Sequence, residues 1–442
     1  MRTTAKTTTR TTTGTTTKTT TGTTARTRTG TGISTGAGTL IAALLLGQLL
    51  WATTAHAQTA DDILNILTKK GTITRQEADS IRRESTIRLN RSEAAADSFP
   101  LRLGRSLSLS GYTQVVYQNF EHPVVGKITD GFTIKRARLD FQGHFSSQFD
   151  YRLLADFIGQ SGANGTAATG GQLISPFLVE AYIVYKPFAG LNVKAGQMIV
   201  EFGPENTTQD RNLDLIERSQ VVNALVARKG DAANGLVDSI GNQNGRDIGI
   251  QLNGSLVRLE GRHLIDYYVQ LLNGAGINTL DNNPSKDIDA RLVIHPLRFL
   301  SLGGSYYDGF DRFTGTPAKD QLRTRWGLES VLDLDRLSVK GEYIHGQDGT
   351  TDLKTGTTAT IHQGWYGQLG YFILPRHLQG VFRYDWYDPN TAKSNIKSTY
   401  YDFGLNYFFN VWTKVQVYYS LRDQEGPAIN NNMFEAQLQL AF

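Results

Sequence analysis

The sequence predicts an all-β protein, a sixteen-stranded antiparallel transmembrane β-barrel preceded by a short periplasmic helical segment. The main evidence is a pattern repeated from Leu107 to Phe442, in which alternating apolar and polar residues are followed by a turn. Because successive side chains of a strand point to opposite faces, each repeat offers one face to lipid and the other to water. Many such strands in series, joined alternately by short turns and long polar loops, are typical of outer-membrane barrels.

The composition fits a membrane protein that does not cross the bilayer with apolar helices. Only 39% of the residues are hydrophobic, and the mean hydropathy is -0.31. The long apolar run from Leu40 to Ala52 is too short to span a bilayer as a helix. In a barrel, polar residues facing the lumen dilute the apolar residues that face lipid. The sequence contains no cysteine, which excludes disulfides and thiol nucleophiles.

Residues 1–57 have the features of a secretory signal peptide with a threonine-rich extension. Leu40–Leu46 begins an apolar core, and Ala55-His56-Ala57 fits a cleavage site of the small-x-small type. The threonine-rich part is open to two explanations, a start codon assigned too far upstream or a low-complexity extension. Without residues 1–57, which contain six bases and no acid, the formal net charge changes from +4 to -2. The basic pI therefore belongs to the leader, and nucleic acid is not an expected partner.

Residues 58–100 are expected to form a small unit ahead of the barrel, which occupies residues 101–442. Asp61–Leu67 and a second segment that starts with the capping box Thr74–Glu77 predict two short helices. Their apolar residues can form one seam, which fits a periplasmic helical hairpin followed by a polar linker. A periplasmic oligomerisation element is the alternative interpretation.

Sixteen candidate strands follow, and their connections predict the topology. Short connections alternate with long polar ones, as periplasmic turns and extracellular loops do in such barrels. The short connections are residues 146–147, 187–190, 296–297, 375–376 and 410–411. The candidate strands are 107–118, 131–145, 148–158, 176–187, 191–200, 246–256, 262–273, 287–296, 298–308, 321–334, 337–346, 361–374, 376–387, 397–409, 412–424 and 432–442.

The connection at residues 201–245 is unusually long and contains apolar stretches with helical periodicity, such as Val221–Val226. Loops much longer than about 12–15 residues are uncommon and usually functional. A sixteen-stranded barrel has an aqueous lumen, so such a loop can bury its apolar side chains by folding inward and narrowing the pore. An extracellular lid or a disordered insert is the alternative.

Strand parity predicts which charged residues line the pore. If Ala137 and Leu139 face lipid, then Arg136 and Arg138 face the lumen, where a guanidinium group attracts anions and can bind two oxygens of one oxyanion. The alternative is that these bases form ion pairs with acids of neighbouring strands and only solvate the lumen. The candidate pore-lining and anion-binding residues are Arg136, Arg138, Lys194, Arg211, Arg218, Arg325, Arg383 and Lys414.

Enzymatic motifs are lacking in the sequence. It contains no G-x-S-x-G, P-loop or H-E-x-x-H motif, and the histidines are isolated. We therefore expect no catalytic residues, no cofactor and no metal. A structural or adhesive barrel without transport, and a barrel hydrolase, are the alternatives to a porin.

Several motifs resemble the phosphate-selective porin O/P family of outer-membrane channels, over about residues 60–442. They are Gly131–Leu139 on the second strand, Ala195-Gly196-Gln197, Phe202-Gly203-Pro204-Glu205, and Ile216-Glu217-Arg218-Ser219 in the long connection. The resemblance implies a homotrimeric porin in the outer membrane of a Gram-negative-type bacterium, surrounded by lipid, with the third loop inside the pore and small anions such as phosphate as solutes. Terminal Phe442 looks like the signal that the barrel-assembly machinery reads.

The long connection departs from a purely basic constriction, because it contains both acids and bases. We expect Arg218, together with Arg136, Arg138 and Lys194 of the wall, to bias the pore toward small anions, and the acids to weaken that bias. The bases include Arg211, Arg218, Arg228 and Lys229, and the acids include Glu201, Glu205, Asp210, Asp214 and Glu217.

Overall fold

The computed structural model describes ten segments of the chain: residues 101–102, 107–121, 130–158, 177–226, 245–259, 262–313, 319–349, 359–411, 413–426 and 431–442. All of them belong to the compact unit Leu89–Phe442. The signal peptide predicted at 1–57 and the helical hairpin predicted at 58–100 lie outside the described residues. In the described segments, no helix is both long and apolar enough to span a membrane.

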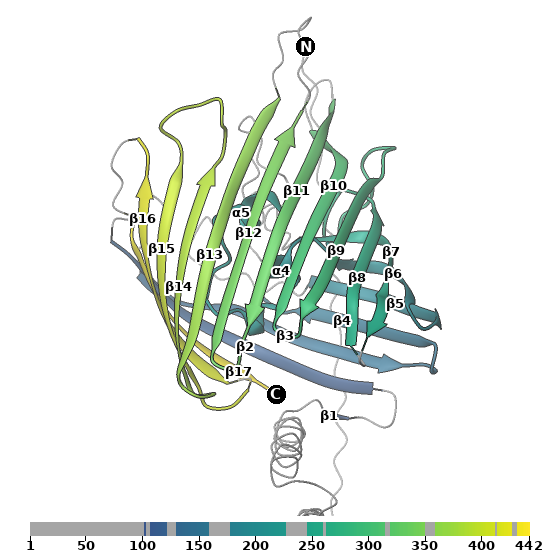
Figure 1. Cartoon of the computed structure of the whole chain (residues 1–442), viewed down its shortest axis with the longest axis horizontal. Helices are drawn as coiled ribbons and strands as arrows, with labels where there is room; N and C mark the ends of the chain where they lie inside the picture. The colour runs from purple at the N-terminus through teal and green to yellow at the C-terminus, as the bar shows by residue number, and fades with distance from the viewer. Residues whose placement is uncertain are drawn as a thin grey trace, which may run out of the picture. The chain divides into compact units, whose positions relative to one another are not determined.

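Sixteen antiparallel strands, β2 to β17, form one closed barrel, which confirms the predicted number and arrangement of barrel strands (Figure 1). Each strand pairs with its neighbours in sequence, and β17 pairs with β2 to close the ring. The strands are β1 (Leu101–Arg102), β2 (Leu107–Phe120), β3 (Asp130–His144), β4 (Phe149–Asp156), β5 (Phe177–Phe188), β6 (Leu191–Ile199), β7 (Arg246–Leu259), β8 (Arg262–Leu272), β9 (Asp287–Leu297), β10 (Leu300–Phe313), β11 (Lys319–Asp333), β12 (Leu337–Asp348), β13 (Thr360–Leu374), β14 (Leu378–Asp388), β15 (Ser398–Phe408), β16 (Lys414–Gln424) and β17 (Met433–Ala441).

The C-terminal residue completes the closure of the ring. Phe442 and Gly111 of β2 exchange two backbone hydrogen bonds, with N···O distances of 2.9 and 3.0 Å. Glycine is required at position 111 because a Cβ atom there would lie only 2.6 Å from the Phe442 ring. The last side chain of the protein is thus seated on the first strand of the barrel.

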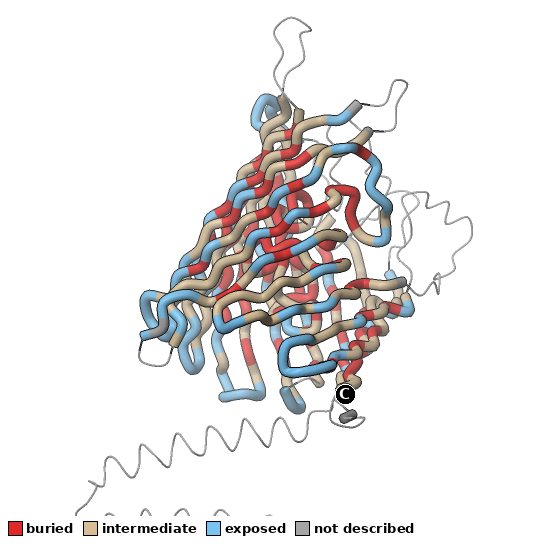
Figure 2. Tube along the Cα trace, turned by 90° about the vertical axis from the view of Figure 1, so that its right-hand side faces the viewer, coloured by how far each residue is buried: buried red, intermediate tan, exposed pale blue. Residues whose placement is uncertain are grey.

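Burial alternates along each strand, as Figure 2 shows by the change of colour from residue to residue. On β13, Tyr366 and Gln368 are buried toward the lumen, whereas Trp365 and Leu369 are exposed on the outside. This period of two confirms the alternation predicted from the sequence. Slipping the register by one residue would move the charged set into lipid, at roughly 2–4 kcal/mol for each Arg or Lys near the bilayer midplane.

The outer face consists of apolar and aromatic side chains that contact one another across strands. Phe149 stacks on Tyr185 with ring centroids 4.8 Å apart, and Phe382 lies 5.3 Å from Phe403. Aromatic pairs of this kind stabilise neighbouring strands beyond the area they bury. Such a surface is suited to lipid rather than to water.

Two turns begin two residues later than the sequence predicts, because each strand continues past a proline. Pro187 belongs to β5 and Pro296 to β9, and both lie where the strand register is interrupted. A bulge leaves one backbone N–H outside the ladder, so proline costs no hydrogen bond there. The short connections are in fact residues 189–190 and 298–299.

Candidate functional site

Residues 201–226, called here the lumenal segment, leave β6 and run inside the barrel (Figure 1). They contain α4 (Pro204–Thr207), the 3-10 helix η1 (Asp210–Asn212) and α5 (Gln220–Leu225). Gly203 has φ +69°, a conformation open to glycine, and it precedes Pro204, whose fixed φ suits the first helical position. Ser219 is the N-cap of α5, and its side-chain oxygen accepts a hydrogen bond from the Val222 N–H. Residues 227–244 of the predicted long connection lie outside the described residues.

One face of the lumenal segment is apolar and packs on the inner wall. A first cluster joins Phe202 and α5 to wall residues of β8, β10, β12 and β13. A second joins Leu215 and Ile216 to wall residues of β2, β14, β16 and β17. Burying each such side chain stabilises the packed state by roughly 1.5–3 kcal/mol, so these contacts fix the segment inside the barrel.

Three glycines of the wall make room for three apolar side chains of the segment. A Cβ atom built at Gly404 would lie 2.6 Å from Cδ2 of Leu215, and one at Gly364 would lie 2.9 Å from Cβ of Val221. At Gly327 it would lie 3.0 Å from the Phe202 ring. Any larger residue would therefore displace the segment or the wall.

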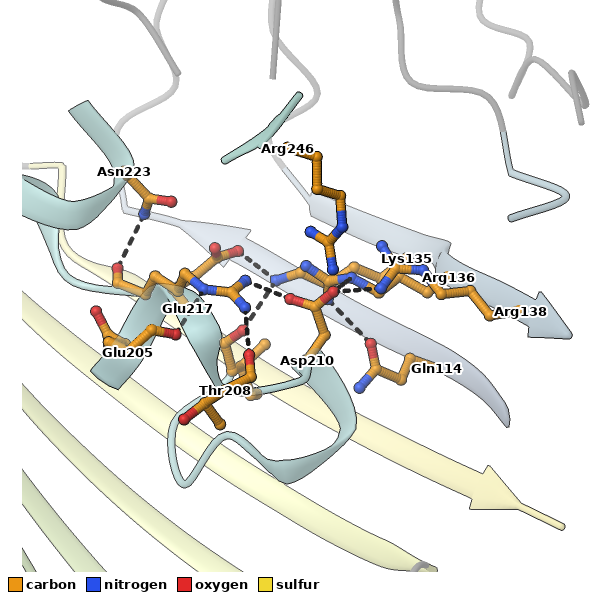
Figure 3. A network of polar contacts seen from close by, with 12 residues as sticks. Gln114, Lys135, Arg136, Arg138, Glu205, Thr208, Asp210, Glu217, Asn223 and Arg246 are labelled. Atoms are coloured by element: carbon orange, nitrogen blue, oxygen red, sulfur yellow. Dashed lines mark hydrogen bonds and ion pairs between the residues drawn. The ribbon is translucent and has the colours of Figure 1, made fainter. Parts of the chain in front are cut away.

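The other face of the segment is charged, and its centre is Asp210, whose side chain is fully buried. Its carboxylate pairs with three arginines. Arg136 and Arg138 belong to β3 (Figure 3), and Arg218 belongs to the segment itself. The Arg136 Nε lies 3.2 Å from an Asp210 oxygen. Arg138 also binds Asp156 of β4 at 2.8 Å. Three guanidinium groups thus surround one carboxylate.

This environment determines the charge of Asp210. Burial alone would raise the pKa of its carboxyl, but Arg136, Arg218 and Arg138 outweigh burial and hold the pKa well below its usual range. Glu201, at the start of the segment, behaves oppositely. Burial raises the pKa of Glu201, and Lys194 and Arg291 only partly oppose it. At neutral pH, Asp210 is therefore a permanent anion within the lumen.

The remaining acids of the segment also pair with bases of the wall. Asp214 binds Lys340 of β12 at 2.6 Å, Glu205 binds Arg383 of β14 at 3.1 Å, and Glu217 binds Lys135 of β3. Glu201 lies 3.7 Å from Lys194 of β6. The acids predicted to weaken an anion bias are thus the groups that tie the segment to the wall.

The eight predicted site residues do not form one cluster. Arg136, Arg138 and Arg218 meet at Asp210, and Lys194 lies beside Glu201. The others are distributed around the lumen. Arg325 binds Asp348 at 2.7 Å, Arg383 binds Asp402 at 2.8 Å, Lys414 binds the Leu213 carbonyl at 2.6 Å, and the Arg211 carbonyl accepts a hydrogen bond from Gln439.

Lys135 was not among the predicted site residues, although it binds both Glu217 and the Ile216 carbonyl. A bulge in β3 shifts the register at this point, so Lys135 and Arg136 both point inward, while Ile134 and Phe132 are exposed. The signal was present in the sequence: parity extended back from Arg136 puts Phe132 and Ile134 in the lumen and Lys135 in lipid. Charge in lipid is costly, so this conflict itself indicates a bulge.

The polar groups of the lumen could hold a small ion or solute, and a cavity of about 130 Å³ lies between the segment and the wall. Within the described part of the chain, no group of three or more histidine or carboxylate side chains is placed to hold a metal ion. The cavity is lined by Pro204, Glu205, Thr208, Leu213, Asp214, Leu215, Val331, Lys340, Tyr366 and Gln368.

Comparison with known proteins places this architecture among the porins. A sequence model of the family described as phosphate-selective porin O and P matches residues 108–312 and 307–442. No curated protein matches the chain in sequence.

Several solved structures are similar in fold. The anion-selective porin from Comamonas acidovorans has a TM-score of 0.54 and 13% identity, over 76% of this chain and 99% of that one. The outer-membrane channel DcaP of Acinetobacter baumannii has a TM-score of 0.52 and 14% identity, over 78% and 99%. OmpT of Vibrio cholerae in its trimer form has a TM-score of 0.50 and 8% identity, over 76% and 99%.

Proposed function

The chain belongs to the phosphate-selective porin O and P family, and we propose that this outer-membrane porin passes small hydrophilic solutes with a preference for anions. The lumenal segment narrows the pathway, so that a solute passes close to the charged residues of the wall. Channels of this class act by diffusion and not by chemistry, and selectivity comes from the size and the charge of the narrowest part.

One observation carries the anion preference: three arginines share a single carboxylate at Asp210. Asp156 offsets part of the excess by pairing with Arg138. The remaining positive charge lies where the segment meets β3. Fixed charges act on a passing ion over about 8 Å at physiological salt, so the bias depends on bases close to the pathway.

Ion pairing limits this preference. Each of the other acids of the lumenal segment pairs with a base of the wall, including the predicted site residues Lys194 and Arg383. Their fields cancel at a distance, which leaves a modest anion bias rather than strict selectivity for phosphate. We therefore propose Arg136, Arg138 and Arg218 as the main selectivity group, with Lys194, Arg211, Arg325, Arg383 and Lys414 as weaker contributors.

Single-channel recording in planar bilayers tests the proposal. In asymmetric potassium chloride, the reversal potential should indicate a higher permeability for chloride than for potassium, and replacing chloride by phosphate should preserve current. A reversal potential that indicates cation preference would contradict the anion bias. A purified, folded barrel without any conductance would indicate a structural or adhesive role in place of transport.

We also propose a homotrimer, exported by the signal peptide at 1–57 and inserted through the C-terminal Phe442. The trimer form of OmpT from Vibrio cholerae, which has the same fold, supports the assembly. The position of Phe442 at the closing seam supports its role as an insertion signal. Native mass measurement with and without residues 58–100 tests whether the helical hairpin predicted there helps to hold the trimer; a monomer in both cases would contradict the assembly.

A further inference from the structure

The carboxylate of Asp214 is held by a set of donors that all belong to the barrel wall. Its Oδ2 accepts hydrogen bonds from the Lys340 ammonium at 2.6 Å and from the Gln368 amide at 3.0 Å. Its Oδ1 accepts from the Gln379 amide at 3.4 Å. One ammonium and two amides, from the three neighbouring strands β12, β13 and β14, thus converge on one oxyanion.

The backbone next to Asp214 is anchored independently of this carboxylate. The Asp214 carbonyl accepts hydrogen bonds from Asn406 at 2.7 Å and from Gln416 at 3.0 Å. The Leu213 carbonyl accepts from Lys414 at 2.6 Å, and Leu215 is seated at Gly404. The main chain therefore stays in place whether or not the carboxylate occupies the three donors.

Space for a ligand lies beside these groups. Asp214, Lys340 and Gln368 all line the cavity of about 130 Å³, which is large enough for several water molecules or a small oxyanion. The pair is not sealed from water, since the Lys340 side chain is 31% exposed and that of Asp214 16%. The donors lie near the short-turn end of the barrel, only a few residues after Leu337 begins β12.

We infer that Lys340, Gln368 and Gln379 form a binding subsite for small oxyanions, carboxylates or phosphates, and that Asp214 occupies it as an internal ligand. The inference rests on the proposed anion pathway. It adds to that pathway a second anion-binding site, separate from the three arginines at Asp210. A passing oxyanion takes the hydrogen bonds of Lys340 and Gln368 while the Asp214 side chain turns into the cavity. Competition with Asp214 keeps the binding weak, so the solute is released rather than trapped.

The test removes the Asp214 carboxylate from the subsite and measures whether small oxyanions then bind in the pore more tightly. Asp214→Ala should make chloride current sensitive to block by acetate or inorganic phosphate, with half-block at about tenfold lower concentration than in the native porin, because the donors are no longer satisfied. Adding Lys340→Gln to Asp214→Ala should restore the native concentration. A lower half-block for acetate than for phosphate would assign a carboxylate subsite, and the reverse a phosphate subsite.

Asp281→Ala is the matched control. Asp281 also pairs with a lysine, Lys286, but in the connection between β8 and β9, so its removal should leave the block unchanged. If Asp214→Ala does not insert as a folded barrel, Asp214→Asn is the second variant, with the same direction and a smaller shift.

The outcomes separate the two proposals. No change in half-block for either probe, or a change that persists in the double variant, overturns the subsite. If the native porin conducts normally but Asp214→Ala is no more sensitive to block, the subsite is overturned and the proposed function stands. A native protein that passes no ions overturns the proposed function.

Discussion

The two faces of the lumenal segment are held in the barrel by different kinds of contact. The apolar face is held by shape, with Leu215, Val221 and Phe202 opposite glycines of the wall. The charged face is held by ion pairs centred on Asp210, whose side chain is fully buried. Shape fixes position without affecting solutes, whereas charge fixes position and also creates the field that solutes meet. The residues expected to select ions therefore serve at the same time as anchors of the segment.

The largest expected effect comes from removing the central anchor of the charged face. Asp210→Ala leaves Arg136 and Arg218 without their shared carboxylate, and breaking buried ion pairs in this way costs about 3–5 kcal/mol. Urea unfolding of the porin in lipid vesicles, followed by tryptophan fluorescence, should show the loss. Asp281→Ala, on an outer connection, should cost under about 1 kcal/mol. Equal stability of the two variants would show that charge does not anchor the segment.

The apolar face is tested at Gly404. Gly404→Ala places a methyl group where Cδ2 of Leu215 lies 2.6 Å away, and overpacking of this kind costs about 1–3 kcal/mol. Adding Leu215→Ala should recover part of that loss, because the methyl group then fills the space that leucine vacates. The measurement is a double-mutant cycle of unfolding free energies. Purely additive costs would mean that the glycine is not a seat for Leu215.

The next effect concerns selectivity rather than stability. Arg136 is the least buried of the three arginines at Asp210, with 12% of its side chain exposed. Arg136→Gln should lower the anion-to-cation permeability ratio about two- to fivefold, which corresponds to roughly 0.5–1 kcal/mol for a partly screened charge. Reversal potentials in a potassium chloride gradient measure this ratio. An unchanged potential would leave Arg136 as an anchor only.

The smallest expected effect is on pH dependence. The lowered pKa of Asp210 means that its stabilising charge is present above the ordinary carboxyl range and is lost only as the pH falls through the lower, folded value. Glu201 has a raised pKa, so on acidification it takes up a proton before Asp210 does. As the pH falls from neutral through the raised pKa of Glu201, the anion preference should rise by less than about twofold. Glu201→Gln should abolish that rise; if the variant keeps it, another carboxyl is responsible.

The strands could be predicted from the sequence because the residues of each strand specify it without reference to the rest of the chain. Alternation along β13 or β17 needs no knowledge of the rest of the chain, and all sixteen predicted strands are present within a few residues of their predicted bounds. The errors occur at irregular positions. Pro187, Pro296 and Lys135 lie at or beside bulges, where one extra residue reverses parity or extends a strand past its expected end.

The candidate site was less predictable, because its contacts connect distant residues. Parity places Arg136 and Arg138 inside the barrel, but it does not reveal that Asp210 lies between them and Arg218. The strand pattern also does not show that a glycine such as Gly404 leaves room for one particular leucine, Leu215. Both facts depend on how the lumenal segment crosses the barrel, which a local pattern does not encode.

The seam between β17 and β2 has a consequence for how the protein folds. The two backbone hydrogen bonds between Phe442 and Gly111 join β17 to β2 and complete the ring. The lumenal segment bonds across long stretches of chain to strands near the C-terminus, as Lys414 does to Leu213 across 201 positions. Such long-range contacts form late, because the entropy of closing the intervening chain must be overcome first. The segment thus acquires its final partners late in folding, so that narrowing the pore and closing the wall belong to the same last stage.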